Sequence, residues 1–392
     1  MSSWKTVALG EIAAVERSSM QPEQIKAGTT YVGLEHIESG GTFLGPKPVG
    51  AGALASSKFQ FTQRHILYGK LRPYLAKIAC PDFSGICSTD ILPILAGPKI
   101  ERRFLFHFLR QPVMVNYANS RAVGVNLPRL SPSVLAKIEI PLPPLTEQRR
   151  IAEVLDRAEA LRAKRRAALD QLDTLTQAIF LGLFGDPEAR GWPMATIADI
   201  ADPSPGSIRT GPFGSQLLHS EFVDEGVAVL GIDNAVANEF RWAERRFISE
   251  AKYRELKRYT VHPGDVLITI MGTCGRCAVV PDEVPVAINT KLLCCVTLQP
   301  KKCLPSFLHA YFLRHPLARR YLDRTAKGAI MAGLDMGIIK AMPIPIPPLP
   351  LQHDFGRRVA AVEKLKSAHR ASLAELDALF AALQHRAFRG EL

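Results

Sequence analysis

The sequence lacks the features that would place the chain in a membrane or in an oxidising compartment. No run approaches the ~20 consecutive apolar residues that a membrane-spanning helix requires. The opening stretch MSSWKTVALGEIAAVERSS has no signal-peptide pattern. Seven cysteines scattered through 392 residues, an odd number, do not suggest a disulfide framework. These absences predict a cytoplasmic protein without a membrane partner.

Motifs for nucleotide-driven or methyl-transfer chemistry are also missing. There is no GxxxxGK[ST] phosphate loop, no GxGxxG that follows a strand and opens a helix, and no [ND]-P-P-[YF] tetrapeptide. Cys274 and Cys277 form a C-x-x-C pair, but Cys294 and Cys295 are adjacent, which makes tetrahedral closure around a metal awkward. We therefore expect no catalytic residue and no metal in this chain, although a site built from scattered residues stays open.

The charge balance is basic. Lys and Arg outnumber Asp and Glu by 49 to 37, which gives a formal net charge of +12 and a pI near 9.5. A basic protein favours anionic partners such as nucleic acid, although the same excess could serve solubility alone. Residues 146–186 contain as many acidic as basic side chains, so the excess lies mainly outside that segment.

The chain repeats itself at an offset of 204 residues. FLRQP from Phe108 corresponds to FLRHP from Phe312, and PLPPLTEQRR from Pro141 corresponds to PIPPLPLQHD from Pro345. The register continues without a gap to Phe184 and its counterpart near the end of the chain, whereas the opening portions match only loosely. The sequence is therefore an internal duplication, each copy being a variable globular part followed by a helix.

Each proline cluster is followed by a helical period of apolar residues. Starting at Ile151 and stepping alternately by four and three residues, every position is apolar except Arg162, Arg165 and Thr176. In the second copy, the corresponding positions are apolar except Lys366 and His369. Leucines precede the shared break by one residue, so we interpret the break as the drift of a straight helix off a 3.5-residue repeat, not as a charge site. Each helix would span roughly 57 Å at 1.5 Å per residue.

Two such helices from one chain most simply bury their apolar stripes against each other in antiparallel fashion, with the alternative that each packs on its own domain. The predicted segments are a globular domain at 1–145, a helical spacer at 146–186, a second globular domain at 187–349 and a second helical spacer at 350–392.

Basic and hydrogen-bonding residues in the globular parts are candidates for contact with DNA. YGKLRPYLAK, from Tyr68, interleaves cations with tyrosines, as contact with phosphates and base edges requires, although a solvated turn would look similar. In the second copy, Gly272 and Gly275 would free Arg276 to point outward. The candidates are Lys70, Arg72, Tyr74, Lys77, Arg121, Arg209, Ser215, Gln216, Arg276, Asn289, Lys291 and Lys327.

Taken together and in this order, these motifs resemble the specificity subunit of type I restriction-modification enzymes over essentially all of the chain. The segments that carry the resemblance are IPLPPLTEQRRIAEVLD, IPIPPLPLQHDFGRRV, the stretches VGVNLPRLSPSVLAKIEI and KGAIMAGLDMGIIKAMPI before them, and GDVLITIMGTCGRCAVVPDEVPVAINTKLL. The resemblance implies an α+β fold. In it, two similar α/β target-recognition domains are separated by an antiparallel coiled coil of two long helices, in a pseudo-two-fold, circular arrangement.

The resemblance also implies partners and a division of labour. Each domain would read one half of a bipartite, asymmetric site in double-stranded DNA, while the helices set the gap. Two methyltransferase subunits and two restriction or motor subunits would join this chain and bind S-adenosylmethionine, ATP and Mg²⁺, so that the chain itself holds no cofactor. Candidate partner-binding residues are Gln148, Arg149, Gln352, Phe184 and Phe388.

Three other hypotheses remain open at this stage. The chain could be an enzyme of another class with a dispersed site. It could be a coiled-coil scaffold that only joins partners, or it could be a DNA-binding subunit of another modification or defence system without restriction.

Overall fold

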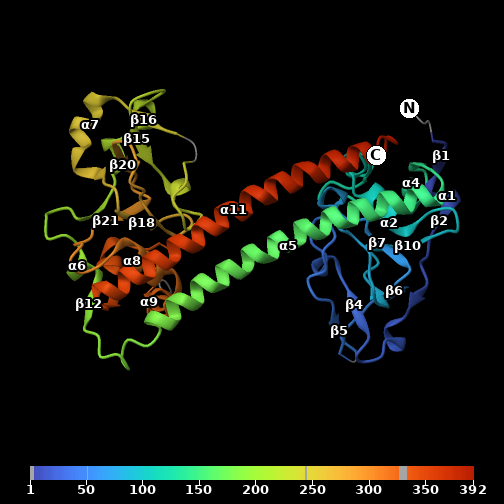
Figure 1. Ribbon diagram of the computed structural model, residues 1–392, viewed down its shortest axis with the longest axis horizontal. Helices are drawn as coiled ribbons and strands as arrows, with labels where there is room; N and C mark the ends of the chain where they lie inside the picture. Colours follow the sequence, from blue (N-terminus) through green and yellow to red (C-terminus); the bar gives the residue numbers. More distant parts are fainter. Residues whose placement is uncertain (1–3, 51, 243–244, 326–332) are drawn as a thin grey trace. The chain divides into compact units, whose positions relative to one another are not determined.

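The computed structural model describes residues 4–50, 52–242, 245–325 and 333–392, and these fall into two units. Unit 1 is Met1–Ala167 with Arg370–Leu392, and unit 2 is Ala168–His369. Two long helices, α5 (Leu145–Phe184) and α11 (Leu349–Ala387), each contribute one part to each unit (Figure 1). Each unit therefore combines a β-rich domain with a part of both helices, and it is described here by itself.

Unit 1 contains two main sheets. The central sheet is antiparallel and has the order β2 (Ala13–Val15), β10 (Ile91–Ala96), β7 (His65–Gly69), β8 (Ile78–Ala79). The mixed sheet has the order β3 (Ser19–Met20), β6 (Lys58–Phe61), β9 (Gly85–Cys87), β4 (Thr30–Val32), β5 (Lys47–Pro48), and only β4 and β9 run parallel. A two-stranded ribbon joins β1 (Thr6–Ala8) to β11 (Glu139–Pro141).

Unit 2 repeats this topology. Its central sheet has the order β13 (Ile208–Thr210), β21 (Leu293–Val296), β18 (Val266–Thr269), β19 (Cys277–Val279). Its mixed sheet has the order β14 (Phe222–Val223), β16 (Phe247–Ile248), β15 (Val227–Leu230), β20 (Ala287–Asn289), β17 (Thr260–Val261), with β15 and β20 parallel. The ribbon pairs β12 (Met194–Thr196) with β22 (Pro343–Pro345). The sheets of the two units differ in which edge of the mixed sheet carries the extra strand.

The helices of each domain cover one face of its central sheet, except α7 of unit 2, which packs against the mixed sheet. Those of unit 1 are α1 (Leu9–Ile12), α2 (Arg102–Leu109), α3 (Pro112–Ser120) and α4 (Pro132–Leu135). Those of unit 2 are α6 (Ile197–Ile200), α7 (Glu250–Leu256), α8 (Pro305–Arg314), α9 (Pro316–Thr325) and α10 (Met336–Ala341). Within the described residues, none of the helices has both the length and the apolar composition needed to cross a bilayer.

Each unit has three layers, namely its helices, its central sheet and its mixed sheet, because side chains alternate between the two faces of the central strands. In β7 of unit 1, Ile66 belongs to the core shared with the helices, whereas the next residue, Leu67, belongs to the core shared with the mixed sheet. In β21 of unit 2, Cys294 and Cys295 divide in the same way. Because neighbouring residues of a strand point to opposite faces, a continuous apolar run buries both sides of the central sheet. The prediction of two similar domains containing helices and sheets is confirmed.

A buried glutamine connects the start of α5 to its domain. The Gln148 side chain is fully buried, and its Oε1 accepts from the Glu101 backbone N–H at 2.7 Å. Its Nε2 donates to the carbonyl oxygens of Lys99 at 3.0 Å and Pro143 at 2.8 Å. One amide group thus joins the proline-rich segment, the helix and the strand-to-helix loop before α2.

The same clamp recurs in unit 2. Gln352 is also fully buried, and it accepts from the Leu304 N–H at 2.8 Å and donates to the carbonyls of Lys302 and Pro347 at 3.1 and 2.9 Å. The proline-rich segment therefore occurs twice in the chain because each domain needs the same rigid connection to its helix.

In unit 1, the parts of α5 and α11 run antiparallel. Arg162 pairs with Asp377, and Arg150 donates to the backbone carbonyl of Leu392 at 2.8 Å, so residue numbers fall along α11 as they rise along α5. The Arg162 guanidinium also lies 4.5 Å from the centre of the Phe380 ring. The two parts are held by apolar, ionic and cation–π contacts together.

Unit 2 shows the same antiparallel pairing. The Lys366 Nζ lies 2.6 Å from Asp173 Oδ1 and 2.7 Å from Glu363 Oε1. Further along, the rings of Phe180 and Phe355 lie 5.5 Å apart in an edge-to-face contact. The Lys366 side chain is only 4% exposed, so this charge lies inside the helix pair.

These contacts correct one expectation from the sequence. Arg162 and Lys366 occupy corresponding positions in the two copies, and we expected the break there to reflect helix drift. Instead, both face the other helix and pair with Asp377 and Asp173, which also correspond to each other. Leu161 and Leu365, expected to replace them in the stripe, are each 52% exposed. A charged residue interrupts the stripe because an acidic partner meets it there.

The glutamine clamp generates a stability prediction. Replacing Gln148 with Ala leaves one buried N–H and two carbonyl oxygens without partners, and we expect the free energy of unfolding to fall by about 3 kcal/mol in urea titrations. Gln352→Ala should cost about the same, because its contacts are equivalent. The exposed neighbour Arg149 is the control, and its change to Ala should stay within about 0.5 kcal/mol. Equal, small losses for all three variants would contradict the clamp.

Candidate nucleic-acid interface

The exposed candidates of unit 1 lie around the turn between β7 and β8. Arg72 and Tyr74 are exposed, Tyr74 by 51%. The Lys70 side chain is 22% exposed, and its Nζ lies 3.9 Å from Asp90 Oδ1. Arg121, at the end of α3, is exposed and stacks at 3.6 Å from the centre of the Tyr117 ring. The turn and α3 contact each other, so these cations lie on one surface.

A hairpin from Val123 to Arg129 is fastened to this turn. Backbone bonds join Val123 and Arg129 in both directions at 3.0 and 2.9 Å, and Leu130 N–H donates to Lys70 O at 2.9 Å. Val123 is 80% exposed and Val125 is 98% exposed. We call the β7–β8 turn Lys70–Lys77 together with this hairpin the reading edge of unit 1.

Sequence reasoning missed part of this edge. Arg129, whose Nε donates to Asp90 at 2.9 Å, and the two exposed valines were not among the candidates. The available signal was that the apolar residues between Val123 and Arg129 do not fit the period of a helix or a strand.

The exposed candidates of unit 2 lie at the corresponding end of its central sheet. Arg276 follows the β18 turn, and Lys291 follows β20; both are exposed. The Gly211 N–H donates to Thr290 O at 3.3 Å, which places the loop carrying Ser215 beside Lys291. Phe213 in that loop is 53% exposed and was also missed. Gln216 is half-buried, and its Oε1 accepts from the Phe213 N–H and the Tyr259 hydroxyl, so it shapes the loop.

Three of the DNA candidates are buried or tied to the backbone instead. Arg209 is 9% exposed and forms a buried ion pair with Asp265 at 2.7 Å. Asn289 is fully buried, and its Nδ2 donates to Leu293 O at 3.0 Å. Lys77 Nζ donates to Leu34 O at 2.6 Å. The predictions for Arg209 and Asn289 were wrong, because both side chains are buried and hold the domain together, whereas Lys77 is half-buried and stays a prediction. Lys327 lies outside the described residues.

Most of the partner-binding candidates are also internal. Gln148 and Gln352 form the clamps described above. Phe184 is fully buried in the core of unit 2, and the Phe388 ring packs 5.1 Å from that of Phe104 in unit 1. Gln148, Gln352 and Phe184 are fully buried, so the predictions that they contact a partner were wrong. Phe388 is partly buried and stays a prediction. Arg149 is exposed and stays a prediction.

The cysteine pairs face different cores. Cys277 and Cys294 lie between the central sheet of unit 2 and its helices, whereas Cys295 lies on the opposite face. Burial raises the pKa of the Cys294 thiol to about 12, so it stays protonated at neutral pH and is a poor metal ligand. Across the part of the chain that the structure describes, no three His, Cys, Asp or Glu side chains are grouped as metal ligands would be.

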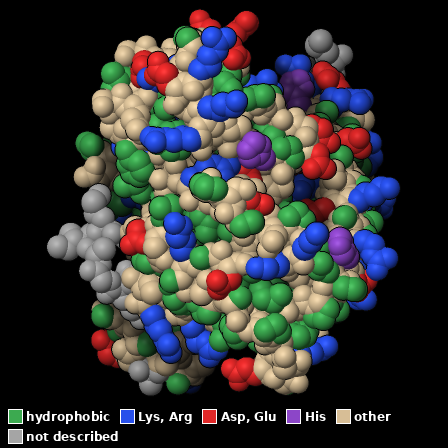
Figure 2. Space-filling model, turned by 90° about the vertical axis from the view of Figure 1, so that its left-hand side faces the viewer, with side chains coloured by type: hydrophobic (Ala, Val, Ile, Leu, Met, Phe, Trp, Pro, Cys, Tyr) green, Lys and Arg blue, Asp and Glu red, His purple; other side chains and the backbone are tan. Residues whose placement is uncertain are grey.

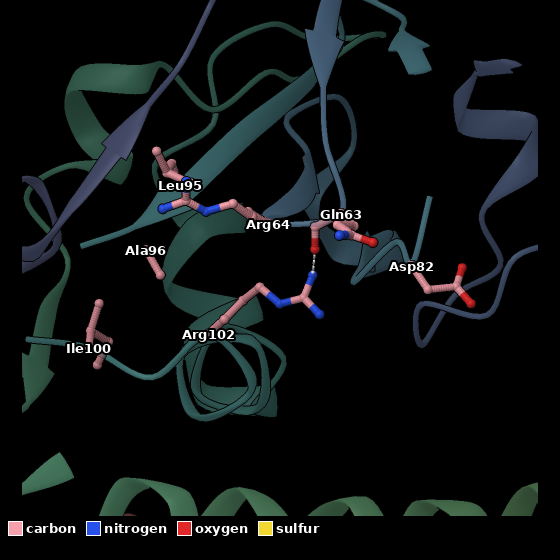
Figure 3. Close-up of a pocket in the computed structure, with 7 residues that line it drawn as sticks. All are labelled: Gln63, Arg64, Asp82, Leu95, Ala96, Ile100 and Arg102. Carbon is pink, nitrogen blue, oxygen red and sulfur yellow. Dashed lines mark hydrogen bonds between the residues drawn. The ribbon is translucent and has the colours of Figure 1, made fainter. Parts of the chain in front are cut away.

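A pocket of about 510 Å³ in unit 1 offers no visible chemistry (Figure 3). It is lined by Gln63, Arg64, Asp82, Leu95, Ala96, Ile100 and Arg102. The Arg102 guanidinium is already used by backbone carbonyls, since it donates to Gln63 O and, at 3.1 Å, to Pro81 O. With one carboxylate and no nucleophile in its lining, the pocket does not contain the paired groups that acid–base or nucleophilic catalysis needs.

The charge on the face shown in Figure 2 is mixed. Lys and Arg side chains are spread among Asp and Glu and among apolar side chains, and do not gather into one basic area. Such a surface favours binding of a polyanion at particular projecting cations over binding to one broad basic area.

Comparison with known proteins identifies one family. The family model described as "Type I restriction modification DNA specificity domain" matches residues 1–171 and 231–378, more than half of the chain. The EcoDI specificity subunit of Escherichia coli is 28% identical over 196 residues, 49% of this chain and 44% of that protein. The MjaVIII specificity subunit of Methanocaldococcus jannaschii is 21% identical over 386 residues, 92% of this chain and 86% of that protein.

A solved structure shares the fold. The S subunit of a type I restriction-modification system from M. genitalium aligns with a TM-score of 0.60 at 15% identity, covering 98% of this chain and 96% of that one. The matches to the EcoDI, EcoBI and EcoKI subunits of E. coli span less than two thirds of the length of those proteins.

The buried pair of Arg209 and Asp265 generates the second prediction. Replacing Arg209 with Leu leaves the Asp265 carboxylate buried without its cation, and we expect a loss of about 3–5 kcal/mol in unfolding free energy. The double variant Arg209→Leu/Asp265→Leu removes both charges and should recover at least half of that loss, measured by urea unfolding. If the single variant is as stable as the wild type, Arg209 does not hold the domain together.

Proposed function

Because the chain belongs to the type I restriction modification DNA specificity family, we propose that it is the non-catalytic, DNA-reading subunit of a restriction-modification complex. Each unit reads one half of a bipartite, asymmetric site in double-stranded DNA. One observation carries the proposal: the two units repeat the same sheets, but the loops at the end of each central sheet carry different exposed side chains. A constant scaffold with variable loops is what the reading of two different half-sites requires.

The exposed residues suit contact with DNA. In unit 1 the reading edge combines cations that can meet phosphates with an exposed tyrosine, and in unit 2 Arg276 and Lys291 project beside Ser215. Phosphate contacts orient a protein on the duplex, and base-edge contacts select the sequence, so both types are needed in each unit. The basic net charge of +12 supports the first type.

The helices have two tasks in this proposal. The lengths of α5 and α11 set the gap between the half-sites. Their exposed leucines, Leu161 and Leu175 on α5 and Leu365 and Leu379 on α11, supply apolar surface for partner subunits; each is between 44% and 52% exposed. The first pair corresponds to the second in the duplication, and members of a pair are two heptads apart, on one side of a helix. Two equivalent surfaces fit two copies of one partner.

We assign the chemistry to those partners. Two methyltransferase subunits bind S-adenosylmethionine and two restriction or motor subunits bind ATP and Mg²⁺, all in a cytoplasmic complex. A scaffold that only joins partners would show no salt-dependent DNA binding even with the methyltransferase present, and a nuclease with a dispersed site would cleave DNA alone in Mg²⁺. A chain that directs methylation without any restriction subunit would belong to another modification or defence system.

Helix length is the basis of the third prediction. Deleting one heptad from the middle of both α5 and α11 removes about 10 Å from each and should shorten the preferred gap by about three base pairs. The gap is measured by selecting bound sequences from a random DNA pool with the chain and its methyltransferase partner. Inserting one heptad in both helices is the matched control and should lengthen the gap by the same amount. An unchanged gap in both variants would contradict a spacer function.

The exposed leucines lead to the fourth prediction. Changing Leu161 and Leu365 together to Glu places charges in the proposed apolar contact and should weaken methyltransferase binding roughly 100-fold, measured by titration calorimetry. Ala163 and Ser367 are exposed, correspond to each other in the duplication and lie on another side of the helices. Their change to Glu should leave affinity within about threefold. Equal losses for both double variants would mean that charge, not the leucine surface, matters.

A further inference from the structure

Backbone strain is concentrated in the β7–β8 turn of unit 1. Among the described residues, three other than glycine have a positive φ, and two of them, Arg72 at 50° and Ala76 at 47°, belong to this one turn. The third is Asn238 at 61°, a residue type that tolerates the left-handed conformation. The turn therefore places two unfavourable residues within five positions.

The conformation of Arg72 is unfavourable for two separate reasons. Its Cβ crowds the following carbonyl oxygen in the left-handed region. In addition, the next residue is Pro73, and a residue before proline is driven towards extended conformations. Strain of this kind persists only where the surroundings fix it, and it is concentrated at functional sites.

Unit 2 shows that glycine satisfies the same turn. The Gly69 N–H donates to Lys77 O at 2.8 Å across the turn of unit 1, and the Thr269 N–H donates to Arg276 O at 2.9 Å across the turn of unit 2. Between those anchors, unit 2 has Gly272 at φ 71° and Gly275 at φ 77°. The backbone thus needs positive φ in both copies, and only unit 1 meets the need with an arginine.

The reading edge fixes the direction of this arginine. The Arg72 N–H donates to Pro128 O at 2.7 Å, and its Nη2 lies 3.4 Å from Asn126 O, both in the hairpin. The side chain is otherwise exposed, with Tyr74 exposed beside it. Since a guanidinium has five N–H donors, the single long bond to Asn126 leaves a pair of donors for a ligand.

We propose that Arg72 is a specificity-determining residue of unit 1 and that it reads a guanine in the major groove of its half-site. The inference rests on the proposed function and deepens it. Two parallel N–H groups of the guanidinium donate to O6 and N7 of guanine, a pairing that no other base offers in the major groove. Phosphate contacts carry no sequence information, and Lys70 and Arg121 on the same surface are cations that can make them.

The test compares variants that relieve the strain with and without loss of the guanidinium. Arg72→Gly, Arg72→Asn and the control Ala76→Gly are each combined with the methyltransferase partner, and preferred sequences are selected from a random DNA pool. Glycine and asparagine both accept positive φ, so thermal unfolding should show Arg72→Gly and Arg72→Asn no less stable than the wild type. Both should lose the preference for guanine at one position of one half-site, roughly 10- to 100-fold, while the other half-site is unchanged.

A second measurement identifies the contacted atom. Replacing that guanine by 7-deazaguanine removes the N7 acceptor and should weaken the wild type and Ala76→Gly about 10-fold, while Arg72→Gly is indifferent. A preserved guanine preference in Arg72→Gly would overturn the inference. Uniform weakening of all sequences with a smaller salt slope would overturn it too, because that is the signature of a phosphate contact. If the wild type selects no sequence at all, the proposed function itself fails.

Discussion

The position of charge inside the helix pair is the constraint on which the rest of the structure depends. Lys366, almost completely buried, meets Asp173 in unit 2, and Arg162 meets Asp377 in unit 1. An unpaired buried charge is expensive, so a sliding of α5 against α11 that separated these groups would be strongly opposed. Apolar stripes alone would allow several registers. The ion pairs thus select one register for each helix pair, and the clamps at Gln148 and Gln352 transmit that register to the domains.

The duplicated pairs also show what the fold holds constant and what it allows to change. At one point of the central sheet, unit 1 pairs Glu16 with His65 at 2.9 Å, and at the equivalent positions unit 2 pairs Arg209 with Asp265. The acid and the base have exchanged strands. Both units keep a polar pair at this point of the central sheet. Either arrangement of acid and base gives the two side chains a hydrogen-bond partner.

The sequence predicted the duplication and the two long helices, because repetition and helical period can be read directly from one chain, and the family resemblance implied two similar α/β domains. The predictions were wrong at four polar residues whose role was inferred from residue type alone, namely Arg162, Lys366, Arg209 and Asn289. Each of these has its partner elsewhere in the chain or on the backbone, and a single sequence does not show which acid or carbonyl it meets. Exposed apolar residues such as Val125 were missed for the opposite reason, because hydrophobicity alone suggests that a side chain is buried.

The turns at the ends of the central sheets show how exposed side chains can change there without loss of the fold. The hydrogen bond between the ends of each turn is the same in both units, and so is the need for positive φ. Glycine meets that need at no steric cost, so a turn like that of unit 2 is the default of the scaffold. A residue other than glycine at these positions is favourable only if the interactions of its side chain contribute more free energy than the backbone strain costs. The strain energy of one such residue is small compared with the free energy of unfolding of a domain. Side chains in these turns can therefore differ between proteins of this fold while the glutamine clamps and the ion pairs between the helices stay the same.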